Sequence, residues 1–180
     1  IRDITGIDVE ANNIKEAMRD NVITRGFNSV DESIENSDIV FICTPVENAL
    51  DYLDKLSDKV RPGTVITDVC STKEQIIQHV NRMTLPPCFV GGHPMAGAEK
   101  GGYSAGSAHL FENAYYIIVP SSSSSPSAVQ LMFELARAIG AIPVQLDAHE
   151  HDRITGGISH VPHIIAASLV NMVRRLDSPE

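Results

Sequence analysis

Histidine is the residue type that this sequence places best for chemistry. His93 lies in the segment Gly91-Gly92-His93-Pro94, directly after an apolar run. Paired glycines allow a ligand to approach the backbone closely, and the proline stiffens the presentation of the imidazole. Histidine is also the usual side chain for proton transfer near neutral pH. The segment therefore predicts a functional histidine rather than one that packs in a core.

A second polar cluster, with the sequence DVCSTK, occupies residues 68–73 and contains Ser71. It follows an apolar run, so we expect it at the end of a strand, where open α/β sheets bind their ligands. Glu74 follows Ser71 by three residues, which is the spacing of a capping box at a helix start. The spacing alone is consistent both with Ser71 as a helix cap and with Ser71 as a ligand-binding residue.

The third cluster consists of His151-Asp152 followed by Ser159-His160-Val161-Pro162-His163. His160 and His163 share one face of a helix because they are three residues apart. A surface pair and a contact with a substrate are both consistent with this spacing. Metal binding with Asp152 as a third ligand is conceivable. No complete metal-binding pattern is present, however, so we expect no metal site.

The secondary-structure elements expected around these residues indicate an α/β fold. Apolar runs without polar alternation, separated by helical periodicity, indicate a mostly parallel sheet covered on both faces, as in a doubly wound Rossmann-like fold. The expected strands are residues 4–8, 38–44, 64–69, 88–92, 114–119 and 142–146. The expected helices are residues 12–20, 46–56, 72–83, 126–140 and 149–176, the last interrupted by Gly156-Gly157 and Pro162.

The two ends of the sequence shape the expected domain organisation. A doubly wound nucleotide-binding domain normally opens with a strand, a G-x-G-x-x-G turn and a helix, but no such motif occurs here. Asp8 ends the first expected strand, where the acidic residue of the second strand is expected. We therefore expect a Rossmann-like domain over residues 1–147 that lacks its first βα unit. Residues 148–180 would begin a second, helical domain.

Composition excludes several classes of function. Fourteen Lys and Arg against 23 Asp and Glu give a formal net charge of -9, which is unsuited to nucleic acid or an anionic membrane. No apolar run approaches the ~20 residues that a membrane span needs. The cysteines, Cys43, Cys70 and Cys88, lack metal spacing and have apolar neighbours. This pattern favours buried free thiols in a soluble, cytoplasmic protein.

Four segments together resemble the prephenate dehydrogenase family, which includes arogenate-using relatives. They are DIVFICTPV at residues 38–46, TDVCSTK at 67–73, GGHPMAGAEKGGYSAG at 91–106 and HDRITGGISHVPH at 151–163. The resemblance runs from residue 4 to about residue 170. It implies an NAD-dependent oxidative decarboxylation of prephenate to 4-hydroxyphenylpyruvate in tyrosine biosynthesis. It also implies a homodimer formed through the helical domain.

The resemblance assigns roles residue by residue. His93 would be the catalytic base that accepts the proton of the substrate ring hydroxyl, and Ser71 would help to hold that hydroxyl and the nicotinamide. Asp8 would bind the adenosine ribose and favour NAD over NADP, because a carboxylate repels a 2′-phosphate. The other implied positions are His160, His163 and Gly92 for the substrate, and Thr44 and Pro45 for the cofactor.

Three alternatives to a prephenate dehydrogenase stay open at this point. Arogenate differs from prephenate only in its side chain, and His163 favours prephenate. A Rossmann-type hydroxyacid dehydrogenase would use a lysine base on a later helix, where this sequence offers histidines. A non-catalytic domain could bind a metabolite or dimerise without chemistry. Turnover of a substrate would exclude the last alternative.

Overall fold

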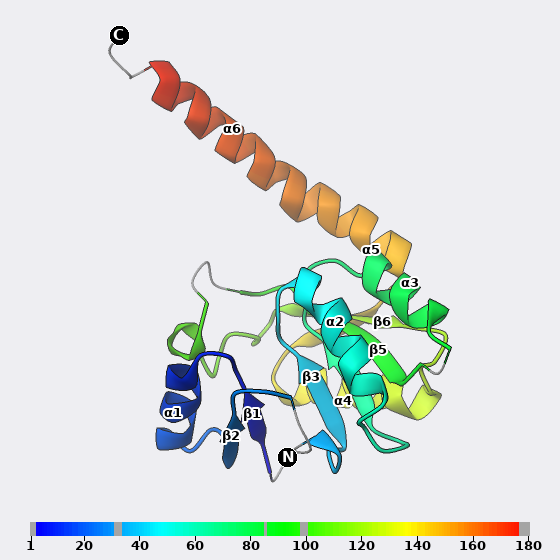
Figure 1. Cartoon of the computed structure of the whole chain (residues 1–180). Helices are drawn as coiled ribbons and strands as arrows, with labels where there is room; N and C mark the ends of the chain where they lie inside the picture. Colours follow the sequence, from blue (N-terminus) through cyan, green and yellow to red (C-terminus); the bar gives the residue numbers. More distant parts are fainter. Residues whose placement is uncertain (1–2, 31–33, 85, 98–100, 177–180) are drawn as a thin grey trace.

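The computed structural model describes residues 3–30, 34–84, 86–97 and 101–176. They form an α/β domain from which the last helix extends (Figure 1). The strands are β1 (Thr5–Ile7), β2 (Arg25–Phe27), β3 (Ile39–Ile42), β4 (Val65–Asp68), β5 (Cys88–Pro94), β6 (Tyr115–Pro120) and β7 (Ile142–Gln145). The helices are α1 (Ala11–Arg19), α2 (Val46–Ser57), α3 (Glu74–Arg82), η2 (Tyr103–Ala105), α4 (Pro126–Ala138), α5 (Ala148–Thr155), η3 (Gly156–His160) and α6 (Val161–Leu176).

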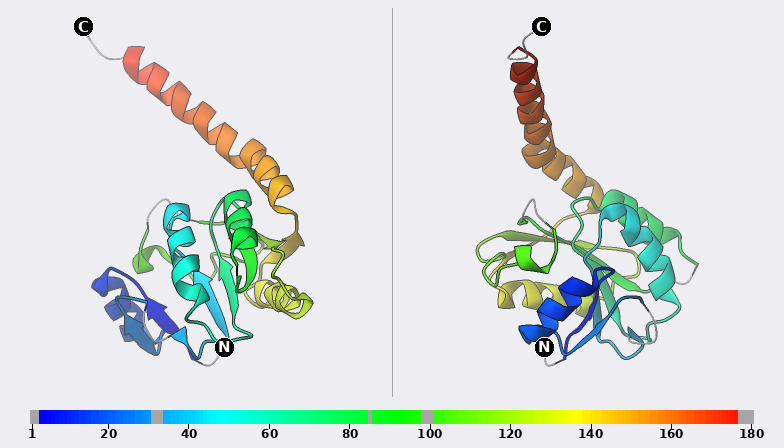
Figure 2. Two further views of the ribbon diagram at one scale, coloured as in Figure 1. Left: turned by 45° about the vertical axis from the view of Figure 1, so that its right-hand side comes forward. Right: turned by 60° about the vertical axis from the view of Figure 1, so that its left-hand side comes forward.

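The main sheet has the order β3-β4-β5-β6-β7 and is parallel except between β5 and β6. A second sheet consists of β1 and β2, which are also parallel. It lies on the β3 side of the main sheet, with α1 beside it (Figures 1 and 2). The arrangement confirms the predicted α/β class with a mostly parallel sheet. Strand β2 was not predicted, because Arg25-Gly26-Phe27 contains no apolar run.

Alternate residues of the central strands pack against helices on opposite faces, since successive side chains of a strand point to opposite sides. One core contains Ile66, Phe89 and Val119 from the strands with Leu53, Ile76 and Val80 from α2 and α3. The other contains Val90 and Ile118 with Ala128, Met132 and Ala136 from α4. Burial of each larger side chain contributes about 1.5–3 kcal/mol. Burial on both faces explains why these strands show no polar alternation.

The chain passes from α5 to α6 without the interruption that Gly156-Gly157 and Pro162 predicted. Instead, residues Gly156–His160 form a π turn, in which the Val161 N–H bonds to the Gly156 carbonyl oxygen. Pro162 has no N–H for a bond four residues back, and the glycines have the freedom to widen the turn. The expected break is therefore a widened turn within a continuous helical segment.

Helix α6 stands away from the domain (Figure 2) and carries many exposed apolar side chains. Those of this helix and the preceding turn are Ile158, Val161, Ile164, Ile165, Leu169, Val170, Met172 and Val173. Contiguous apolar surface of this kind marks a site of interaction.

The three cysteines are free thiols. Cys70 is buried and Cys88 partly buried, but Cys43 is exposed, so the expectation that all three are buried is wrong for Cys43. Cys43 follows β3, whose Phe41 is also 40% exposed. This edge of the sheet therefore has less cover than its centre. Over the described ranges, no helix has the length and apolar character needed to cross a membrane.

Candidate active site

Three parallel strands bring predicted site residues to one edge of the main sheet. Thr44 and Pro45 follow β3, Ser71 follows β4, and His93 lies at the end of β5. Because the carboxyl ends of parallel strands meet at the same edge, these residues border the region where open α/β sheets bind ligands. Ser71 and Pro45 are exposed there.

His93 is the most buried of the histidines predicted to act in the site, with 8% of its surface exposed. Its Nδ1 lies 2.8 Å from Nε2 of His151, a fully buried residue of α5. Burial lowers the pKa of His93 to about 4, and the neighbouring His151, Lys73 and His160 act in the same direction. The imidazole is therefore neutral at pH 7 and can accept a proton.

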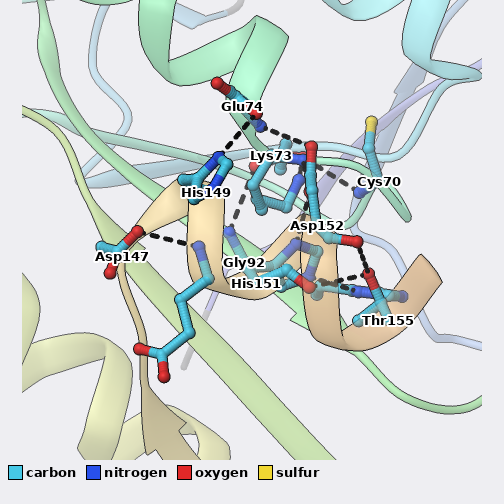
Figure 3. Close-up of polar contacts among 12 residues, drawn as sticks. Cys70, Lys73, Glu74, Gly92, Asp147, His149, His151, Asp152 and Thr155 are labelled. Carbon is cyan, nitrogen blue, oxygen red and sulfur yellow. Dashed lines mark hydrogen bonds and ion pairs between the residues drawn. The ribbon is translucent and has the colours of Figure 1, made fainter. Parts of the chain in front are cut away.

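Asp152 links the histidine pair to the start of α3. Its carboxylate accepts hydrogen bonds from the backbone N–H groups of Lys73, at 2.7 Å, and Glu74, at 3.0 Å, and its Oδ1 lies 2.6 Å from Nδ1 of His151 (Figure 3). Burial alone raises the pKa of Asp152, but these hydrogen bonds outweigh it and leave that pKa below its usual value. Asp152 is thus an ionised cap on a helix N-terminus.

The capping box predicted at Ser71 is therefore wrong. Helix α3 begins at Glu74 with Lys73 as its N-cap, and no side-chain cap is formed there. Two N–H groups at this helix start, those of Lys73 and Glu74, are instead satisfied by Asp152, 79 residues later than Lys73. Ser71 is left exposed and available to a ligand.

Lys73 and Asp68 form a fully buried ion pair, and Lys73 is close enough to His93 and His151 to lower the pKa of both. The Asp68 carboxylate also accepts hydrogen bonds from the N–H groups of Cys70, at 3.0 Å, and Gly92, at 3.1 Å. A Cβ on Gly92 would lie 2.6 Å from the Asp68 carbonyl oxygen and 2.8 Å from Oη of Tyr116. This close approach explains the glycine at position 92, whereas its predicted contact with substrate stays a prediction.

Asp8 follows β1 and is held by neighbours in sequence. Its Oδ1 accepts a hydrogen bond from the Glu10 N–H and its Oδ2 one from Nδ2 of Asn13, both at 2.8 Å. The Oδ1 of Asn13 in turn accepts a bond from the Tyr103 N–H at 3.2 Å. Tyr103, which begins η2, therefore lies against α1 close to Asp8.

The side chain of Thr44, just after β3, indicates a position where a ligand could bind. Among the described residues, its Oγ1 is buried without a hydrogen-bond partner. Buried hydroxyl groups are normally paired, so such an atom calls for a ligand or a water molecule.

The two histidines of the third cluster differ in position. His160 belongs to the π turn, is partly buried and lies close enough to His93 to lower its pKa. His163 is exposed on α6, and no hydrogen bond or ion pair within the described ranges joins it to the other site residues. Nor do those ranges contain a group of His, Cys, Asp or Glu residues that could hold a metal ion.

The residues that sequence reasoning missed are those that support His93. It gave no role to His151, Asp68 or Lys73, and it considered Asp152 only as a metal ligand. The sequence did carry a signal for these residues. They lie in two of the segments that resemble the family, residues 67–73 and 151–163, and each segment follows an apolar run closely. Only the fold shows that these charges are buried and paired.

Comparison with known protein families places the chain. The family model "Prephenate dehydrogenase, nucleotide-binding domain" matches residues 2–144, and "Prephenate dehydrogenase, dimerization domain" matches residues 147–180. A prephenate dehydrogenase of Bacillus subtilis (strain 168) is 37% identical over 178 residues, which are 97% of this chain and 48% of the relative. The chain thus spans about half the length of that relative.

Solved structures agree with this placement. Prephenate dehydrogenase from Aquifex aeolicus, in complex with hydroxyphenyl propionate and NAD+, is 28% identical with a TM-score of 0.90. The match covers 98% of this chain and 62% of that one. Arogenate dehydrogenase from Synechocystis is 26% identical with a TM-score of 0.83, covering 94% of this chain and 60% of that one. The sequence segments, the fold and both family models therefore agree that this chain belongs to the prephenate dehydrogenase family.

Proposed function

We propose that the protein containing this chain is an NAD-dependent prephenate dehydrogenase that converts prephenate to 4-hydroxyphenylpyruvate. The observation that carries the proposal is His93, a neutral and buried imidazole at the carboxyl edge of the sheet. The family match argues against the hydroxyacid dehydrogenase alternative.

The residues at the carboxyl edge of the sheet would have different roles in this reaction. The contribution of bound NAD is to accept a hydride from the substrate carbon that carries the hydroxyl. His93 accepts the hydroxyl proton, and a positioned base of this kind contributes about 10²–10⁴-fold to the rate. Loss of carbon dioxide then makes the ring aromatic, so this step needs little help from the protein. Ser71, His160 and His163 would hold the substrate.

The chain fits NAD at two places. The unpaired Oγ1 of Thr44 is suited to a polar atom of the cofactor beside β3. The carboxylate of Asp8 lies at the end of β1, where dinucleotide-binding folds hold the ribose hydroxyls. Pro45 would lie along the cofactor between these elements. An acidic group at this position favours NAD over NADP because it repels a 2′-phosphate.

The assembly and domain boundary belong to the same proposal. Residues 1–147 form the nucleotide-binding domain, and residues 148–180 begin a helical dimerisation domain. The exposed apolar side chains of α6 support a homodimer, which sedimentation equilibrium would test through the mass. Three free thiols fit the reducing conditions of the cytoplasm.

The decisive experiment offers prephenate and arogenate separately to the whole protein with NAD and follows NADH formation. We expect turnover with a higher kcat/KM for prephenate. A higher kcat/KM for arogenate would replace the proposal with an arogenate dehydrogenase. Binding of NADH, seen as enhanced nicotinamide fluorescence, without turnover of either compound would favour a non-catalytic domain.

A further inference from the structure

Asp152, His151 and His93 form a hydrogen-bonded series that runs from the start of α3 to the end of β5. We propose that His151 and Asp152 are positioning residues that hold His93 with its proton on Nδ1, so that Nε2 is free to accept the substrate proton. The catalytic consequence rests on the proposed function, whereas the protonation pattern itself does not.

The series begins with a group that can only accept. An ionised carboxylate has no proton to donate, and Asp152 faces three N–H groups, from Lys73, Glu74 and His151. The two backbone donors hold it ionised at the helix N-terminus. The short contact of 2.6 Å to Nδ1 of His151 is therefore a bond that His151 donates.

The protonation of His151 then fixes that of His93. His151 is fully buried, and burial outweighs the adjacent Asp152 so that its pKa lies below the ordinary value. A neutral imidazole that donates from Nδ1 has a bare Nε2, which must accept. The partner of that Nε2 is Nδ1 of His93, 2.8 Å away. His93 consequently carries its proton on Nδ1.

This pattern prepares His93 for both stages of proton transfer. Before the reaction, Nε2 has a free lone pair. After the reaction, the imidazolium still donates from Nδ1 to His151, which in turn donates to the Asp152 carboxylate. The other titratable groups near His93 are Lys73 and His160, and both lower the pKa of His93. The carboxylate at the far end of the series is thus the group that offsets them.

The first test reads the protonation pattern directly and needs no activity. Ring ¹⁵N chemical shifts of the unsubstituted protein at pH 7, assigned with single His→Gln variants, distinguish the two neutral tautomers and the cation. We expect His93 and His151 both to be neutral and protonated on Nδ1. A proton on Nε2 of His93, or a cationic His151, would overturn the proposal.

The second test compares two substitutions at one position. In His151→Leu, nothing accepts the bond from Nδ1 of His93, and we expect kcat to fall on the order of 10²-fold with little change in KM. In His151→Gln, Oε1 can still accept that bond, so most of the lost activity should return. The matched control is His149→Gln, an exposed histidine on the same helix, which should retain wild-type kinetics.

The outcomes separate this inference from the proposed function. Wild-type kcat in His151→Leu, or an equal loss in His151→Leu and His151→Gln, would contradict the positioning role. If His151→Leu does not fold, the ¹⁵N shifts of the unsubstituted protein decide. A protein that turns over neither substrate but shows the expected shifts would refute the proposed function and leave the protonation pattern standing.

Discussion

Asp8 and His93 both stand at the carboxyl ends of strands, but they are held by contacts of very different range. The carboxylate of Asp8 bonds to Glu10 and Asn13, two and five residues away, in a partly exposed turn. His93 is buried and bonds to His151, 58 residues away, which is held in turn by Asp152. A change at Asp8 should therefore alter ligand recognition alone, whereas changes around His93 should affect chemistry and folding together.

The largest expected effect tests the chemical half of this contrast. Replacing His93 with Asn keeps a hydrogen-bonding side chain but removes the group that takes up the proton. We expect kcat for NADH formation to fall by about 10²–10⁴-fold, or about 3–5 kcal/mol in barrier. NADH binding, followed by nicotinamide fluorescence, serves as the control and should be unchanged. Near-parental turnover in a variant that binds NADH would refute the assigned role.

The folding half of the contrast is tested by Lys73→Met. This change leaves the Asp68 carboxylate buried without its counter-ion, which should lower the free energy of unfolding in urea by about 3–5 kcal/mol. Arg25→Met, which removes an exposed pair with Asp3 in the small sheet, is the matched control. It should leave the urea midpoint nearly unchanged. Equal losses in the two variants would erase the distinction.

Asp8→Ser tests the local site. Serine can still accept the bond from the Glu10 N–H but no longer repels a 2′-phosphate. We expect the ratio of kcat/KM for NAD to that for NADP to fall by about tenfold, with an unchanged urea midpoint. Asp51→Ser, an exposed change on α2, is the control. An unaltered preference in Asp8→Ser would show that another residue selects the cofactor.

The free energy of unfolding should also depend on pH through the buried histidines. Burial holds the pKa of His93 near 4 and that of His151 below its usual value, whereas in the unfolded chain both titrate near 6.5. The unfolded state therefore binds more protons below pH 6.5, and the free energy of unfolding should fall as pH falls from 6.5 toward 4. Urea titrations should show a shallower fall in His93→Gln and the parental fall in His149→Gln.

The separation in sequence between interacting residues also determined how much of the fold and the site could be predicted. The apolar runs of β3, β4 and β5 predicted the sheet, because strands that are buried on both faces consist almost entirely of apolar residues. Asp8 was recognisable from its place at the end of a run. His93 stood out because glycines and a proline surround it.

Features that depend on distant partners escaped prediction. The start of α3 is fixed by Asp152 rather than by the nearby Ser71, so local spacing misled. Strand β2 exists through its pairing with β1, and a Cβ at its Gly26 would lie 2.2 Å from Cγ2 of Ile14 on α1. The bond between His93 and His151 requires α5 to pack against α3 and β6, which no local pattern reveals.

The π turn at Gly156–His160 accommodates one extra residue in the otherwise continuous helical segment from α5 to α6. Successive residues of an α-helix are turned by about 100° from one another, and a π turn holds one residue more than an α turn. Because both kinds of turn complete one revolution, removing one residue there would leave the direction of the apolar side of α6 nearly unchanged, whereas removing one residue from α6 itself would turn every side chain beyond it by about 100°. Since His160 lies in the same turn, the extra residue widens the helix at a site histidine without redirecting the apolar side of α6.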